Sequence, residues 1–202
     1  MNKIPLEFND VDARNDRRLA EYEFARDMIH TPAISHGIEE LEQLSHQGSV
    51  MSILMIADAM RQGWLYAKDL AGAVEWYRVA VDAGSLRALH GLALAYREMG
   101  RLEEAVSHLE DAIERGFPPA YNSLAAMLFK GEEIPVDRAK ALSLWKTGAA
   151  LGHLPSRRNL LQQRLQGHYG LLGRVRGFLD IVPFALEYVT VRNETPYTDR
   201  LR

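Results

Sequence analysis

The stretch AGAVEWYRVAVDAG, residues 71–84, has the spacing of an amphipathic helix that packs closely against a neighbour. Its apolar residues recur every three or four positions, which is the period of one helix face. Two alanines flank a Trp76-Tyr77 pair, and the stretch ends at Gly84. Two helices approach closely where one presents a small residue, and a large ring fills the hollow beside it. We therefore predict one helix of a packed pair, with the Trp76 ring in such a hollow.

The same pattern occurs three times. When the terminal glycines Gly84, Gly116 and Gly152 are aligned, the stretches before them are AVEWYRVAVDAG, AVSHLEDAIERG and ALSLWKTGAALG. Alanine is the small residue that we expect at two places in each stretch, first at Ala73, Ala105 and Ala141, then at Ala80, Ala112 and Ala149. A large residue lies four positions after the first alanine, at Tyr77, Leu109 and Trp145. With Gly48, the glycines lie 36, 32 and 36 residues apart, a period typical of stacked helical repeats.

A matching first helix precedes each of these stretches. It carries a large-small pair, which is Ile56-Ala57, Leu92-Ala93 or Leu124-Ala125. A bulky residue follows three positions after the alanine, at Met60, Tyr96 or Leu128. The closing glycine supplies the left-handed conformation that ends the second helix. Each unit is therefore predicted to be an antiparallel helix pair.

These residues carry a resemblance to two related repeat families. The outer units resemble Sel1-like repeats, because Gly63 and Gly131 lie six residues before Asp69 and Asp137. The middle unit, with LALAYREMGRLEEA at 92–105, resembles a tetratricopeptide repeat. The resemblance covers residues 48–167 and includes a partial last unit, HLPSRRNLLQQRLQG. It implies an all-α fold, a right-handed α-solenoid of stacked antiparallel helix pairs with N-terminal and C-terminal capping helices.

The sequence departs from the repeat pattern in three units. Met60 and Leu128 stand where the family has an aromatic residue before the loop, and Leu161 and Arg164 replace the small residue and the aromatic of the last unit. We therefore expect the last repeat helix to be a terminal helix rather than half of a complete pair.

Three regions follow from this pattern, and the first is an N-terminal helical cap over residues 1–48. The cap is predicted as a helix over 13–29, with Leu19, Tyr22 and Ile29 near one face, and a second helix after Ser35 as its N-cap, with Ile38, Leu41 and Leu44 inward. Such caps cover the apolar face that a terminal repeat exposes. The repeats occupy 49–167. Residues 168–202 form the third region, an amphipathic helix followed by an extended basic tail.

Composition limits the classes of function. Residues 155–202 contain eight arginines and four acidic residues, which leaves 16 of the 24 basic and 23 of the 27 acidic residues in residues 1–154. Because the phosphate backbone demands a strong positive surface, this acidic body argues against a nucleic-acid partner. There is no cysteine, no apolar run long enough to span a membrane and no secretory leader at the start, so we expect a cytoplasmic protein.

No pattern of catalytic residues is apparent. The seven histidines form no HExxH motif and no pair four residues apart, so no metal site is predicted. We interpret them as structural, with His108 in the helix-packing position that Trp76 has one unit earlier. The glycine-rich GLLGRVRG at 170–177 lacks the spacing of a nucleotide-binding loop. We therefore expect no enzyme activity and no cofactor.

In the resembling families, the first helices of successive units line the concave side. The residues of this sequence that fall on that side are Arg61, Arg87, His90, Arg97, Asn122, Phe129, Lys130 and Arg158, with Asp58 between the first ones. Arginines pair bidentately with carboxylates, and an asparagine amide can hold a peptide backbone. The pattern favours a groove that binds an acidic or carboxylate-bearing peptide. The alternative, which we weigh equally, is that these are ordinary solvated charges on helix faces.

The C-terminal region allows three interpretations. Residues 170–182 predict an amphipathic helix that Pro183 ends or bends, with the apolar side Leu171, Leu172, Val175, Phe178, Leu179 and Val182. The segment LEYVTV at 186–191 alternates and is predicted to be extended. The helix either covers the open end of the repeats, docks on another protein, or rests on a membrane surface. The first is favoured because a terminal repeat exposes apolar area, and the third is least favoured because only two basic residues flank the stripe.

Taken together, the sequence predicts a scaffold or adaptor that binds a partner protein or peptide in the groove of a helical repeat array. The resemblance implies a role in assembling or regulating a complex, often in bacterial signalling or envelope pathways. The alternative is an accessory or regulatory subunit of an enzyme complex that acts through its C-terminal tail. The sequence leaves the oligomeric state open.

Overall fold

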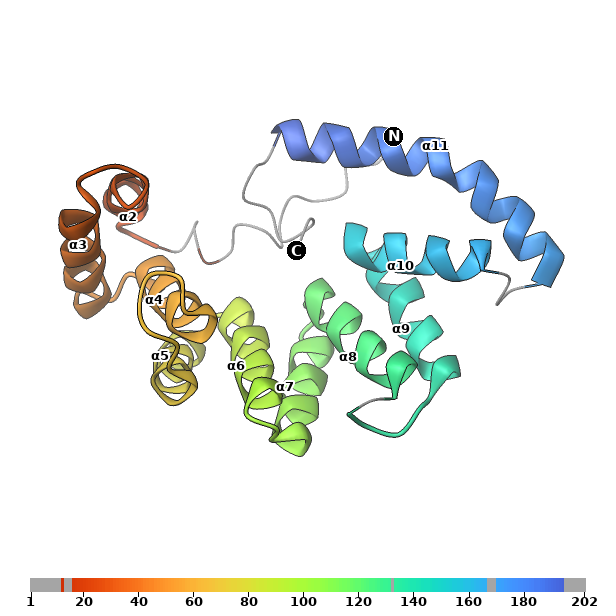
Figure 1. Cartoon of the computed structure of the whole chain (residues 1–202), viewed down its shortest axis with the longest axis horizontal. Helices are drawn as coiled ribbons and strands as arrows, with labels where there is room; N and C mark the ends of the chain where they lie inside the picture. Colours follow the sequence, from red (N-terminus) through yellow and green to blue (C-terminus); the bar gives the residue numbers. More distant parts are fainter. Residues whose placement is uncertain (1–11, 13–15, 132, 167–169, 195–202) are drawn as a thin grey trace. The chain divides into compact units, whose positions relative to one another are not determined.

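The structure is a computed structural model that describes residues 12, 16–131, 133–166 and 170–194. Over these residues every regular element is an α-helix (Figure 1). The helices are α2 (Leu19–Met28), α3 (Ile34–His46), α4 (Val50–Gln62), α5 (Leu70–Asp82), α6 (Leu86–Glu98), α7 (Leu102–Glu114), α8 (Pro118–Lys130), α9 (Arg138–Ala150), α10 (Leu154–Leu165) and α11 (Gly170–Glu194).

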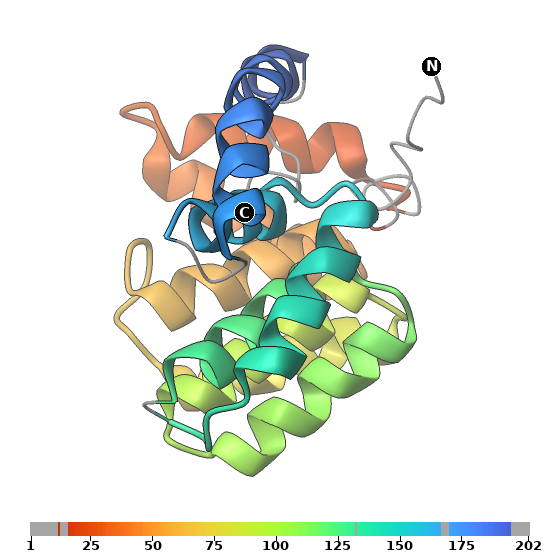
Figure 2. The same ribbon diagram turned by 90° about the vertical axis from the view of Figure 1, so that its right-hand side faces the viewer.

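Successive helices pack as antiparallel pairs, as the repeat pattern predicts. The pairs are α2 with α3, α4 with α5, α6 with α7, and α8 with α9 (Figures 1 and 2). The helices fall into two compact units, one of residues 10–115 with α2–α7 and one that begins at Gly116 with α8–α11.

The small residues of the second helices are buried, with one correction. Ala73, Ala105 and Ala141 have no exposed surface, and neither have Ala80 and Ala112. In the last full unit the buried small residue is Gly148, whereas Ala149 is half-buried, so the prediction of Ala149 was wrong by one position. The reason is the helix period, because Gly148 lies seven residues after Ala141, as Ala80 lies seven after Ala73.

The large residues occupy the hollows that these small residues leave. Tyr77, Leu109 and Trp145 are each less than 5% exposed. Trp76, by contrast, is only partly buried and packs at the edge of the core formed by α4–α7. Tyr77 is therefore the ring that fills the hollow. In the first helices the predicted pairs Ile56-Ala57, Leu92-Ala93 and Leu124-Ala125 are all buried.

The closing glycines have the predicted left-handed conformation. Gly48, Gly84, Gly116 and Gly152 have φ angles of 85°, 90°, 76° and 83°. This geometry lets the amide of the next residue reach back into the helix, as in the 3.0 Å bond from Ser85 N to Ala80 O. That next residue then caps the following helix, since the Ser85 hydroxyl accepts from the amide of Ala88 at 3.0 Å. One glycine-serine pair thus ends one helix and starts the next.

The N-terminal helix pair packs on α4 and covers its apolar side. Tyr22 and Ile29 of the first helix region and Leu41 and Leu44 of α3 are buried, as predicted, and partly buried residues of α4 pack against them. The predicted N-cap is wrong, because α3 begins at Ile34 and Ala33 precedes it without a side-chain cap. The predicted helix over 13–29 is observed from Leu19 to Met28, and residues 13–15 lie outside the described residues.

The last helix differs most from the prediction. Helix α11 continues through Pro183 as far as Glu194, so the extended segment predicted at 186–191 is wrong. It lies beside α10 and curves along its length (Figures 1 and 2). The Arg157 side chain of α10 pairs with Glu187 and lies over the Phe184 ring, 5.8 Å from its centroid. These contacts just after the proline hold the chain helical where local propensity favours a strand.

Candidate partner-binding site

The predicted groove residues divide between the two units. Arg61, Arg87, His90 and Arg97 belong to α4 and α6, in the unit of residues 10–115. Asn122, Phe129, Lys130 and Arg158 belong to α8 and α10, in the unit that begins at Gly116. The structure brings members of each set together, and the two sets are considered in turn.

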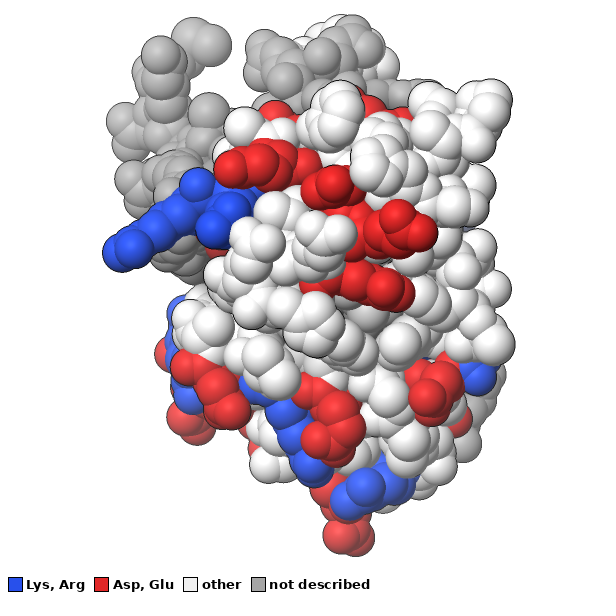
Figure 3. Space-filling view, turned by 90° about the vertical axis from the view of Figure 1, so that its left-hand side faces the viewer, with Lys and Arg blue, Asp and Glu red and all other residues white. Residues whose placement is uncertain are grey.

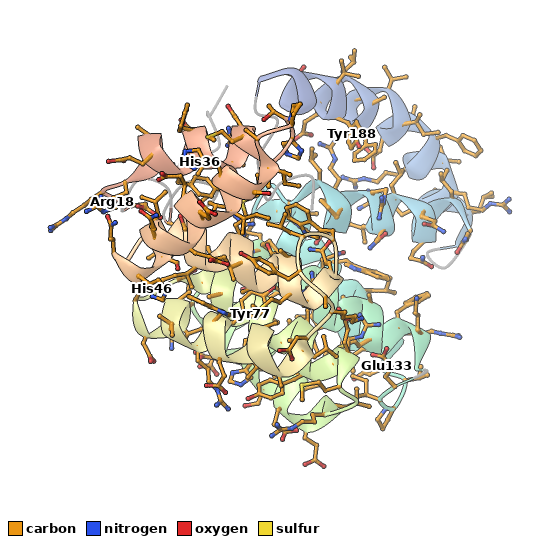
Figure 4. All side chains as sticks on the ribbon, turned by 60° about the vertical axis from the view of Figure 1, so that its left-hand side comes forward. Arg18, His36, His46, Tyr77, Glu133 and Tyr188 are labelled. Atoms are coloured by element: carbon orange, nitrogen blue, oxygen red, sulfur yellow. The ribbon has the colours of Figure 1, made fainter. Side chains whose placement is uncertain are left out.

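In the first unit a buried tyrosine and a half-buried carboxylate organise the site. The Tyr77 hydroxyl donates to Oδ1 of Asp58 at 2.5 Å, and Arg87 donates to Oδ2 of the same carboxylate at 3.1 Å. Tyr77 comes from α5 and lies among the helices of this unit (Figure 4). Burial, and then the Asp58 charge, raise the pKa of Tyr77 above its ordinary value of 10. The tyrosine is therefore a permanent hydrogen-bond donor that orients Asp58.

Arg61 belongs to the same hydrogen-bond network and connects Tyr77 to Glu98. Its Nε donates to the Tyr77 hydroxyl at 3.3 Å, and its terminal nitrogen donates to Glu98 at 2.5 Å. Lys68 also pairs with Glu98, at 2.8 Å. Partial burial acts to raise the pKa of Glu98, but the hydrogen bonds from Lys68 and Arg61 hold it below its ordinary value. Because the Arg61 side chain is only 15% exposed and already paired, its main role is to join α4 to α6.

His90 lies half-buried on α6 near these charged groups. Burial lowers its pKa to about 4, an effect that the Asp58 charge opposes and the charges of Arg61 and Arg87 reinforce. His90 is therefore neutral at pH 7, and it offers a hydrogen-bonding ring rather than a positive charge. Arg97, in the last turn of the same helix, is half-buried.

Two aspartates before α2 bind at the starts of α4 and α6. Asp16 accepts hydrogen bonds from the Ser49 hydroxyl at 2.7 Å and from the Met51 amide at 2.8 Å. Asp12 accepts from the Ser85 hydroxyl at 2.8 Å. Burial raises the pKa of Asp12, while the Ser85 hydrogen bond and the charge of Arg87 oppose that rise. A helix N-terminus favours a carboxylate because its amides are unpaired and its dipole is positive there.

Sequence reasoning missed these two aspartates, although a signal was present. Asp12 and Asp16 lie four residues apart, and Ser49 and Ser85 both follow a closing glycine, 36 residues apart. An open hollow of about 550 Å³ lies beside Asp16 and Ser49. On the face shown in Figure 3, acidic side chains gather in the upper half, whereas basic side chains lie at the left edge and in the lower half.

In the second unit two of the predicted residues, Asn122 and Phe129, contact Trp145 of α9. Oδ1 of Asn122 accepts from the indole nitrogen of Trp145 at 3.0 Å and from Asn159 of α10 at 2.9 Å. The Phe129 ring packs against Trp145 with centroids 5.1 Å apart. Asn122 and Phe129 thus tie α8 to its neighbours. Lys130 and Arg158 are exposed and lie at the end of α8 and on α10.

Two of the described histidines, His108 and His153, have packing or capping contacts. The His108 ring stacks on Tyr96 with centroids 5.3 Å apart, as expected of a helix-packing residue. His153 caps α10 by accepting from the Ser156 amide at 3.3 Å. Among the described residues there is no group of three or more potential metal ligands of the His, Cys, Asp or Glu type. None of the described helices is both long and apolar enough to cross a membrane.

Comparisons with known proteins agree with the architecture of paired helices. Residues 85–116 match the model of a tetratricopeptide repeat family. No curated protein matches the chain.

Several solved structures resemble the chain. A Sel1 repeat protein from Oxalobacter formigenes has a TM-score of 0.66 at 21% identity, with 86% of this chain and 75% of that chain covered. A putative Sel1 repeat protein from Klebsiella pneumoniae gives 0.55 at 20% identity, with 91% and 93% covered.

A third similar structure is a protective antigen of uropathogenic Escherichia coli described as having an SLR fold. Its TM-score is 0.53 at 25% identity, with 64% of this chain and 29% of that chain covered. The paired helices, the buried small residues and these likenesses together identify the fold. The chain has the all-α fold of Sel1-like and tetratricopeptide-like repeat proteins, with successive helices packed as antiparallel pairs.

Proposed function

We propose that this chain is an adaptor or scaffold that binds an acidic segment of a partner protein on the first helices of its repeats and has no catalytic activity of its own. Repeat proteins with this fold are generally protein-binding scaffolds. Their stacked helices present extended surfaces suited to a peptide or to another domain. The proposal that the bound segment is acidic is based on residues of this chain and not on the fold.

The observation that carries this proposal is the way the chain holds its own Asp12 and Asp16. Each carboxylate accepts from a serine hydroxyl at a helix start, and Asp16 also accepts a backbone amide. Arg87 lies two residues after Ser85, and its positive charge opposes the rise in the pKa of Asp12. Two carboxylates of the chain are thus bound by serines at the same place in two successive units, and a partner's carboxylates could use the same chemistry.

The predicted residues take different parts in this proposal. Arg87 and Arg97 supply charge on α6, and His90 supplies a neutral ring between them in the sequence. Arg61 acts mainly by fixing Tyr77 and Glu98. In the second unit, Lys130 and Arg158 are the exposed cations that we propose as contacts. Asn122 and Phe129 would act there through the shape that they give to the surface around Trp145.

Affinity capture with the purified chain as bait tests the proposal. The partner is identified by mass spectrometry, and its acidic segment is then titrated as a synthetic peptide. We expect Arg87→Glu combined with Arg97→Glu to weaken peptide binding by about tenfold or more, since a desolvated charge pair typically contributes over 1.4 kcal/mol. The matched control reverses Arg78 and Arg115, exposed arginines associated with the second helices. Equal binding by both double variants would contradict the proposal.

Circular dichroism separates lost binding from lost folding in these variants. The captured partner could instead be an enzyme present in a one-to-one ratio with the chain. If its binding is unaffected by the Arg87 and Arg97 changes, the accessory-subunit alternative is favoured.

A further inference from the structure

The apolar side of α11 faces outward, away from the helix that supports it. Gly177 is buried against α10, where a Cβ would lie 3.1 Å from Leu165 and 3.2 Å from Arg164. Asp180 accepts from Arg164 of α10 at 2.6 Å, and Glu187 accepts from Arg157. Helix α11 therefore rests on α10 through a glycine and its acidic residues. Helix α11 thus packs on the last repeat helix, as expected, but its apolar stripe does not make that contact in the described residues.

The outward stripe extends along most of the helix. It consists of eight large apolar side chains that are 51% to 85% exposed: Leu171, Leu172, Val175, Phe178, Leu179, Val182, Leu186 and Val189. Side chains of this kind bury roughly 60–120 Å² each when they become covered. The stripe therefore offers about 500–1,000 Å² of apolar surface, close to the ~800 Å² that one partner contributes to a stable interface. An exposed patch of this size marks an interaction surface.

The stripe repeats every seven residues. Val175, Val182 and Val189 form one column, Leu172, Leu179 and Leu186 form a second, and Leu171 and Phe178 begin a third. A straight helix drifts by about 20° per seven residues, so a strict seven-residue repeat fits a partner helix around which α11 can wind. β-branched residues in one column with leucine in another are typical of helix-helix seams. A lipid surface requires an apolar face but no such period.

The charges on α11 favour one arrangement of such a partner. Of the four charged side chains that the structure describes on α11, Asp180 and Glu187 pair with α10, and Arg174 and Arg176 are exposed near the N-terminal end of the stripe. A parallel pair of α11 helices would place four arginines together. An antiparallel pair centred on the stripe separates equivalent arginines by roughly 12–18 Å, beyond the ~8–10 Å screening length.

We propose that α11 is a dimerisation helix, and that its outward stripe is covered by the α11 stripe of a second copy of this chain in antiparallel orientation. A self-complementary patch of this kind closes a two-fold symmetric dimer, the commonest form of oligomer. The arrangement leaves the contacts of α11 with α10 unchanged.

Sedimentation equilibrium of the full chain tests the dimer. We expect a mass twice the 22.8 kDa of one chain at micromolar concentration. Val182→Glu should weaken the dimer by about tenfold or more, because it buries a charge in the seam. The matched control is Val79→Glu, at a valine of α5 that is 50% exposed and outside the stripe. A monomeric wild-type chain, or equal weakening by both variants, would overturn the proposal.

Orientation is tested by disulfide trapping, which the cysteine-free sequence makes simple. Chains with Leu171→Cys are mixed with chains carrying Val189→Cys under oxidising conditions. An antiparallel dimer should give the mixed disulfide in excess, whereas a parallel dimer gives the two homodisulfides and overturns the stated arrangement. Flotation with phosphatidylglycerol vesicles provides the last test. A wild-type chain that is monomeric in solution and floats with the vesicles, while Val182→Glu does not, would assign the stripe to a membrane surface and overturn the proposal.

Discussion

The ring of Tyr77 occupies the space that a side chain on Gly91 would need. A Cβ built at Gly91 of α6 would overlap three ring carbons of Tyr77 from α5. The two helices pack directly against each other, and Tyr77 is 1% exposed. This pair is the clearest instance of the small-large packing that the repeat sequence predicts.

Gly91→Ala should therefore destabilise the chain, although alanine is the better helix former by about 1 kcal/mol. Overpacking of a closed core costs about 1–3 kcal/mol, and we expect a net loss of about 1–2 kcal/mol in the free energy of unfolding by urea. In a Tyr77→Ala background the ring is gone, so the same change should be neutral or stabilising. If Gly91→Ala stabilises the otherwise unchanged chain, the packing described here is incorrect.

The neighbouring rings Trp76 and Tyr77 should differ in their contribution to stability. Tyr77 is buried, and its hydroxyl bonds Asp58, whereas Trp76 is only partly buried at the edge of the core. We expect Tyr77→Ala to cost about 3–5 kcal/mol and Trp76→Ala no more than about half of that. Urea unfolding of the two variants at one pH measures both. The reverse order would place Trp76 in the hollow, as the sequence alone suggested.

Internal repetition explains why so much of the fold could be predicted. A small residue in one unit is weak evidence, but Ala73, Ala105 and Ala141 at the same place in three units show that close packing is required there. Helix ends were predicted from a conformational requirement, since glycine adopts the positive φ of a helix terminus without strain. The segment 186–191 was wrongly predicted to be extended because local rules ignore the contacts of Phe184 and Glu187 with Arg157, which hold α11 together.

The candidate site was harder to predict because pairing is a property of the fold. Arg61 and Glu98 are 37 residues apart, and Arg87 and Asp58 are 29 apart. Neither spacing identifies a pair in a single sequence. The prediction therefore identified cations on the first helices without their partners, and it overlooked Asp12 and Asp16. Their serine partners lie 33 and 73 residues away in the sequence, and nothing local identifies them.

Asn122 should stabilise the second unit through its acceptor oxygen. It accepts from Trp145 and from Asn159, and thereby joins α8 to α9 and α10. Asn122→Ala leaves a mostly buried indole N–H without this acceptor, and we expect a loss of about 1–3 kcal/mol. Asn122→Asp retains an acceptor for both donors, so it should cost clearly less at pH 7. Thermal unfolding followed by tryptophan fluorescence compares the two variants, and an equal loss would argue against the role of the acceptor.

His90 should make the chain less stable in mild acid. Its pKa is lowered to about 4 in the folded chain, chiefly by burial, whereas an unfolded histidine titrates near 6.5. Between these values the unfolded chain binds more protons, so stability rises with pH. The stability that neutral His90 contributes is complete above about pH 6.5 and is lost as the pH falls toward 4. For a pKa shift of this size the loss is up to roughly 3 kcal/mol.

His90→Gln should remove this part of the acid sensitivity, because glutamine cannot be protonated in this range. The difference in unfolding free energy between pH 7 and pH 4.5 is measured by urea titration for the wild type and for the variant. We expect the wild type to lose about 2 kcal/mol more than His90→Gln over that interval. His36→Gln, at an exposed histidine of α3, is the matched control and should keep the wild-type slope. If the wild type and His90→Gln lose the same unfolding free energy between pH 7 and pH 4.5, His90 is protonated in the folded chain without penalty. Arg61 and Arg87 would then tolerate a third positive charge beside them.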